Sequence, residues 1–90
     1  MVSIRVEKPT AERLKELAVE TWSTWECGVE TFDWQYPSDE TAYVKAGRVT
    51  VRTEHGQEVT FGAGDLVFFP QGLRCTWTVH VPVRKVYVME

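Results

Sequence analysis

The sequence predicts an all-β fold, a small closed barrel or sandwich with one short helix near the N-terminus. From Trp22 onward, apolar and polar residues alternate with a period of two, the pattern of half-buried strands. Turn-forming glycines and prolines interrupt this alternation at short intervals, as in small barrels. Ninety residues are enough for one domain, which we place at 1–90.

The N-terminal segment holds the expected helix. Residues 3–7 alternate apolar and charged side chains and predict a strand. Thr10 can cap a helix of about two turns, in which Leu14, Leu17 and Ala18 share one face. We expect this face to pack on the barrel wall. The strands predicted after the helix are 29–36, 40–46, 48–54, 57–62, 65–70, 75–81 and 83–89.

Specific turn residues separate these strands. His55-Gly56 predicts a two-residue hairpin turn. Gly47 and Gly72 stand where tight turns need a positive φ. Pro82 interrupts the last apolar stretch and is typical of an edge or a bulge.

Charge and hydropathy exclude several classes of partner. The net charge is −3 and no cluster of Lys and Arg occurs, so we expect no nucleic-acid partner. No apolar run approaches the ~20 residues of a membrane span, so we expect no membrane partner. The N-terminus lacks the apolar core of a signal peptide, which predicts a cytoplasmic protein. Cys27 and Cys75 are then expected to be reduced thiols.

Two spaced patterns identify a family. Glu40 precedes Gly47 by seven positions, and Gly64-Asp65 is followed by Pro70 and Gly72. Both patterns in this order, in an all-β chain of this length, resemble the two motifs of the cupin superfamily. The resemblance implies a jelly-roll β-barrel of the RmlC-like type.

The closer resemblance is to small cupins related to the cupin domain of (S)-ureidoglycine aminohydrolase-like proteins. Those relatives often carry His at the position of Val86, where this chain departs from them. The segments that carry the resemblance are Trp22-x-x-Trp25, Phe32-Asp33-Trp34, Phe69-Pro70-x-Gly72, Cys75-x-Trp77 and Lys85-x-Tyr87.

The resemblance also implies where a cupin metal would bind. Its ligand positions correspond to Trp34, Tyr36, Glu40 and Cys75, of which only Glu40 is a usual cupin ligand. Tryptophan has no lone pair to donate, and tyrosine is a poor ligand below its pKa. We therefore expect no bound metal and no cofactor, although Glu40, Cys75 and Tyr36 leave a zinc or copper site as an alternative.

The histidines do not change this expectation. His55 falls in the predicted hairpin turn, and His80 lies on the strand face opposite to Cys75 and Trp77. Both are expected at the surface.

Strand alternation selects the candidate site residues except Arg74, which is included because it could supply charge. Either the aromatic rings fill the barrel core and Glu40 pairs with Lys85, or the rings line a cleft for a ligand. Near Lys85 or Arg74 the Cys75 thiol would have a lowered pKa and could act as a nucleophile. The candidate catalytic residues are Glu40, Tyr36, Cys75 and Lys85. The candidate ligand-binding residues are Trp34, Tyr36, Glu40, Arg74, Cys75, Trp77, Lys85 and Tyr87.

Three functions fit this pattern. The leading one is a metal-free cupin that binds a small polar metabolite in an aromatic-lined pocket, with isomerase- or hydrolase-type acid–base chemistry. The alternatives are a non-catalytic binding module and a metal-dependent hydrolase or dioxygenase. We also expect a homodimer, because a chain of this size gains buried apolar area by joining sheets.

Overall fold

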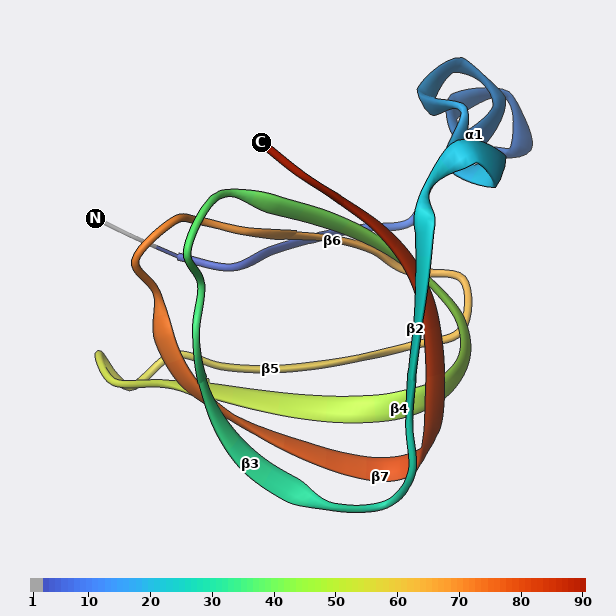
Figure 1. Ribbon diagram of the computed structural model, residues 1–90. Helices are drawn as coiled ribbons and strands as arrows, with labels where there is room; N and C mark the ends of the chain where they lie inside the picture. The colour runs from blue at the N-terminus through green and yellow to red at the C-terminus, as the bar shows by residue number, and fades with distance from the viewer. Residues whose placement is uncertain (1–2) are drawn as a thin grey trace.

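A computed structural model describes residues 3–90, and antiparallel strands make up most of it (Figure 1). The predicted all-β class and the single short helix near the N-terminus are confirmed. Within the described residues, no helix is long and apolar enough to cross a membrane. The elements are β1 (Arg5–Glu7), α1 (Ala11–Leu17), η1 (Val19–Thr21), β2 (Ser23–Cys27), β3 (Thr31–Gln35), β4 (Glu40–Thr53), β5 (Glu58–Gly62), β6 (Leu66–Phe69) and β7 (Arg74–Met89).

The two long strands, β4 and β7, pair antiparallel along most of their length and form the centre of the barrel. The first half of β4 and the second half of β7 lie between β6 and β2, and β1 extends this layer beyond β6. Their other halves lie between β5 and β3 and form the second layer. Both layers are thus built on the same pair of strands, which bend from one layer to the other.

The bend lies at Gly47 and Pro82. The β4–β7 register shifts on both sides of Gly47, next to the segment of β7 that contains Pro82. Gly47 has φ +98, and a Cβ there would lie 2.3 Å from the carbonyl oxygen of Pro82. The predicted breaks at these two residues are therefore bulges inside continuous strands, because the bend keeps the backbone hydrogen-bonded on both sides.

The core occupies the inner faces of the two layers. Val49, Val51 and Phe61 are almost fully buried there, together with Trp77 and Val79 of β7. The inward positions of β4 are even-numbered before Gly47 and odd-numbered after it.

The bulge explains one wrong expectation. Alternation from Glu40 predicts that Ala46 continues the inner face, but Ala46 is exposed. The extra residue at the bulge turns its side chain outward.

The helix is capped as predicted but is anchored by a different residue. The Thr10 hydroxyl accepts a backbone N–H from the first turn at 3.1 Å, and Ala18 ends α1 in the left-handed conformation. Leu14 and Leu17 are only half-buried, and Ala18 is exposed. The apolar anchor is Val19, which is buried where η1 packs against β7. Figure 1 shows α1 beside the barrel, at one corner.

Two local predictions need correction. The segment Ser23–Cys27 was not predicted as a strand, yet it forms β2 and pairs with β7. The hairpin between β4 and β5 has a three-residue loop, because Thr53 and Gln57 still pair and Gly56 takes φ +90.

The Gly64-Asp65 motif has a clear structural role. Asp65 is buried, and its Oδ2 atom accepts the N–H of Gly62 at 2.9 Å, which closes the turn between β5 and β6. Its other carboxylate oxygen pairs with Lys8 at 2.6 Å. Asp65 therefore joins this turn to the segment between β1 and α1.

Candidate functional site

A cavity of about 470 Å³ opens from the inner face of the barrel, and we name it the aromatic pocket. Its volume lies in the range of small-molecule sites. Six of its wall residues are aromatic, and Glu40 and Lys85 provide charge in its interior. The pocket is lined by Trp25, Glu30, Phe32, Trp34, Tyr36, Pro37, Glu40, Trp77, Lys85, Tyr87 and Met89.

The charged centre of the pocket is an ion pair between Glu40 and Lys85. The Lys85 ammonium donates to Glu40 Oε2, and the two residues are 5% and 6% exposed. The predicted pairing is confirmed, but Lys85 does not lie across the barrel. It is on β7, the neighbour of β4, and stands opposite Val44 in the register. The two long side chains therefore meet along one inner face.

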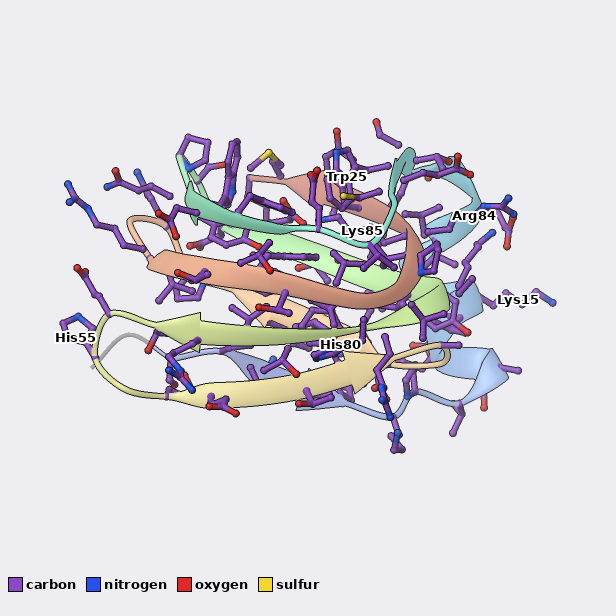
Figure 2. The ribbon with its side chains drawn as sticks, turned by 90° about the horizontal axis from the view of Figure 1, so that it is seen from below. Lys15, Trp25, His55, His80, Arg84 and Lys85 are labelled. Atoms are coloured by element: carbon purple, nitrogen blue, oxygen red, sulfur yellow. The ribbon has the colours of Figure 1, made fainter. Side chains whose placement is uncertain are left out.

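Aromatic rings surround the Lys85 ammonium. Its Nζ atom lies 5.1 Å from the ring centres of Trp25 and Trp77, 5.2 Å from Tyr87 and 5.8 Å from Phe69. Such rings attract a cation through their π faces. Burial lowers the pKa of Lys85, and the Glu40 carboxylate opposes that effect without cancelling it. In Figure 2, Lys85 and Trp25 lie near each other on adjacent strands, while Arg84 points away from the barrel.

Tyr36 is a buried phenol at the wall of the pocket. Its oxygen accepts the indole N–H of Trp77 at 3.2 Å, and its ring stacks on Phe69 at 4.7 Å. Burial, together with the charge of Glu40, raises the pKa of Tyr36 far above its usual range. The phenol therefore stays protonated and can serve a ligand only through hydrogen bonding.

The tyrosine hydroxyls at the pocket are not hydrogen-bond partners of Glu40. Among residues 3–90, the side-chain partner of Glu40 is Lys85, and neither Tyr36 nor Tyr87 bonds to the carboxylate. Tyr87 is half-buried and contributes its ring to the cage around Lys85.

Trp34 stands at the mouth of the pocket. It is 45% exposed and contacts Tyr36 edge to face, with 6.2 Å between ring centres. An exposed indole beside a cavity can pack against a ligand without losing contacts with the protein core.

Cys75 and Arg74 are not part of the aromatic pocket. They border a wider hollow of about 690 Å³, together with Arg52, Thr53 and neighbouring residues. Arg74 is exposed, and the Cys75 thiol donates to the Trp34 carbonyl at 3.6 Å. Burial raises the pKa of Cys75 to about 11, so this thiol is protonated at neutral pH and is a poor nucleophile.

Both histidines lie outside the barrel, as predicted. His55 is at the tip of the β4–β5 loop, and His80 is exposed on the outer face, 2.8 Å from the Thr50 hydroxyl (Figure 2). Neither reaches the aromatic pocket.

The residues at the cupin metal positions do not fit a metal ion. Glu40 is engaged by the Lys85 ammonium, a cation that already faces this carboxylate. Trp34 offers no lone pair, and the phenol of Tyr36 stays protonated. Within residues 3–90, no three His, Cys, Asp or Glu side chains come close enough to form a metal site.

Five pocket residues escaped prediction from sequence, namely Trp25, Glu30, Phe32, Pro37 and Met89. Trp25 and Phe32 pack on Trp77 with ring centres 5.8 Å apart in each case, and Glu30 lies at the rim. Trp25 could have been found, because the alternation Ser-Thr-Trp-Glu-Cys is a short strand pattern. Phe32 shares strand parity with Trp34, which was selected.

Comparison with solved structures finds a match over almost the whole chain. A DUF861 family protein from Thermotoga maritima is 51% identical, with a TM-score of 0.96, covering 98% of this chain and 100% of that one. The EutQ protein of Clostridium difficile is 32% identical, with a TM-score of 0.67 over 73% of this chain. A putative ethanolamine utilization protein Q from Salmonella typhimurium is 30% identical, with a TM-score of 0.66 over 73% of this chain.

The extent of these matches differs. The chain spans about half of each EutQ protein, 52% and 53% of their lengths. No match is found among curated proteins. The sequence pattern of the EutQ-like cupin domain matches residues 14–87, which includes β2 to β6 and most of β7. Together with the barrel and its two motifs, this match shows that the chain belongs to the EutQ-like cupin domain family.

Proposed function

We propose that this cupin binds a small polar metabolite in the aromatic pocket, with Glu40 and Lys85 as the charged contacts. The ion pair carries the proposal, because it places a carboxylate and an ammonium in the interior at a cavity of ligand size. A buried ion pair adds little stability compared with apolar residues of equal volume. Its presence at a pocket therefore supports a role in binding.

Acid–base chemistry is the reaction class that this pair supports. Isomerase- and hydrolase-type reactions need one group that gives a proton and one that takes it, and Lys85 and Glu40 are such groups. A binding module without catalysis would use the same contacts. The two differ in whether a bound ligand is converted, which NMR spectra of the ligand recorded over hours would decide.

Two likenesses suggest compounds to test. The motifs resemble those of ureidoglycine aminohydrolases, so small ureides are candidate ligands. The Salmonella relative is described as a putative ethanolamine utilization protein, so ethanolamine is a second candidate. A metal-dependent reaction has less support, because the donor set does not fit a metal. Ammonia release from ureidoglycine, with and without added Mn²⁺, tests that alternative.

The test of binding is a screen of small polar metabolites by thermal shift and ligand-observed NMR. Trp34→Ala should raise the Kd of a compound that binds by about tenfold, because it removes one aromatic contact at the mouth. Glu40→Gln should weaken binding further, because it removes the negative charge beside Lys85.

Trp22→Ala is the matched control. Trp22 is half-buried at the end of η1 and does not line the pocket. Its replacement should leave the Kd unchanged. If Trp34→Ala and Glu40→Gln bind the ligand with the same Kd as the wild-type protein, the aromatic pocket is not the binding site. The same conclusion follows if no compound binds to the wild-type protein.

A further inference from the structure

Lys85 differs from the other lysines in its surroundings. The chain has four lysines, and only Lys85 is buried among the described residues. The comparison residue is Lys45 on β4, which is exposed and lies 3.7 Å from Glu20. Both lysines thus lie in strands beside a carboxylate, but Lys85 lines the aromatic pocket and Lys45 does not.

The surroundings of Lys85 favour a reactive amine. Burial lowers its pKa, so a larger fraction of this amine is neutral than at the surface. A desolvated lysine in an apolar pocket is the form that attacks carbonyl carbons. The aromatic walls also limit the access of bulk water, which would hydrolyse a C=N bond formed at this amine.

Glu40 is positioned to move the protons of such a reaction. Its Oε2 atom accepts a hydrogen bond from Lys85 Nζ, so the carboxylate can take a proton from the nitrogen directly. It can then return this proton to a departing oxygen bound to the same carbon. The nucleophile and its proton carrier therefore border the same cavity.

We propose that Lys85 forms an imine with a small aldehyde or ketone bound in the aromatic pocket. This inference rests on the proposed binding function and names the ligand class. Glu40 first takes a proton from the Lys85 ammonium, and the nitrogen lone pair that this frees bonds to the carbonyl carbon. The C=O π electrons move to the oxygen, which receives that proton from Glu40 and becomes a hydroxyl group. Glu40 then takes a second proton from the nitrogen and delivers it to the hydroxyl group. Water leaves as the C=N bond of the protonated imine forms, and no oxidant or reductant is consumed.

Reductive trapping tests the proposal on the intact protein. The protein is mixed with glycolaldehyde and sodium cyanoborohydride at neutral pH, and the adducts are located by peptide mass mapping. Each adduct adds the mass of the aldehyde less one oxygen atom. Lys85 should be labelled several-fold faster than Lys45. Lys85→Arg should remove the fast adduct, and Lys45→Arg should leave it in place.

A control independent of variants is the same reaction in urea, where all lysines are solvated. The ratio of the Lys85 to the Lys45 rate should fall to about one. A folded-state ratio of one or less would overturn the proposal.

The outcomes also separate this inference from the binding function. If metabolites without a carbonyl group bind in a Trp34-dependent way while Lys85 stays unlabelled, the imine is wrong and the pocket remains. If Lys85 is labelled quickly but no metabolite binds, the amine is reactive and the proposed binding function fails.

Discussion

The Glu40–Lys85 pair combines two effects that oppose each other at the level of single residues. Removing both charges from water costs several kcal/mol per ion, and the attraction between the two charges offsets part of that cost. The rings of Trp25 and Trp77 add a further attraction for the ammonium. The pKa of Lys85 is nevertheless lowered, so desolvation exceeds the compensation at the nitrogen.

This balance predicts how stability depends on pH. Because the pKa of Lys85 is lower in the folded than in the unfolded state, the unfolded chain binds more protons between the two values. The free energy of unfolding therefore rises with pH through this window, up to the ordinary lysine value of 10.5.

The measurement compares wild type with Lys85→Met by urea unfolding from about pH 8 upward. The contribution of Tyr36, whose raised pKa destabilises the folded state at alkaline pH, is removed when the free energy of unfolding of the variant is subtracted from that of the wild type. The wild-type value should increase relative to the variant as pH increases. If this difference in the free energy of unfolding stays constant or decreases as pH increases, Glu40 keeps the Lys85 ammonium charged.

At the scale of elements, the barrel depends on the bend shared by β4 and β7. Gly47 is the position where the bend has the least space, because its backbone has φ +98 and the Pro82 carbonyl lies against it. A glycine is required for both reasons.

Gly47→Ala should lower the free energy of unfolding by about 3 kcal/mol or more, because strain from the positive φ adds to a backbone clash. Gly56→Ala is the matched control: its φ is +90, but a Cβ there would meet nothing within 4 Å. The control should lose about 1 kcal/mol. Equal losses in urea unfolding would mean that the contact with Pro82 does not matter.

The strands could be predicted where alternation is regular and turn residues bound it. This holds for β5 and β6, whose predicted ranges of 57–62 and 65–70 enclose them. The continuity of β4 and β7 could not be predicted, because Gly and Pro mark a bulge and a chain break in the same way. β2 was missed because it follows closely on η1, with no Gly or Pro to mark where it begins.

The candidate site was predictable to the extent that strand parity defines it. Glu40, Trp77 and Lys85 face inward as their positions indicate. Strand parity indicates which residues face inward, but it does not indicate which of them line the same cavity. That depends on the bend in β4 and β7 and on which strands lie beside each other. Cys75 was grouped with the pocket for this reason and Arg74 for its charge, although both border the wider hollow.

The whole molecule has strand edges and apolar side chains available for a partner. β1, β2, β3 and β5 each pair with only one neighbour, so each has an edge without a strand partner in the described chain. Val29 is 67% exposed beside β2, and Val81 is 48% exposed at the bend. Exposed edges and apolar residues of this kind favour association with a second strand.

We propose that the protein is a homodimer. Light scattering coupled to size exclusion should give twice the chain mass of 10.4 kDa. Val29→Lys should shift the protein toward monomer if β2 forms the interface. His80→Lys, which changes an exposed residue of the outer face, should leave the mass unchanged. A single monomer peak for wild type at about 50 µM would contradict the proposal.

The position of β7 has a consequence for how the chain reaches its folded state. This last strand pairs with β2, β3 and β4, so both layers are incomplete until Arg74–Met89 is present. During synthesis from the N-terminus, β2, β3 and β4 emerge before this shared partner strand. Pairing between residues so distant in sequence is slow, because closing a long loop costs entropy before any stabilising contact forms. We therefore expect the barrel to fold only after β7 has been synthesised, with the earlier strands exposed to aggregation until then.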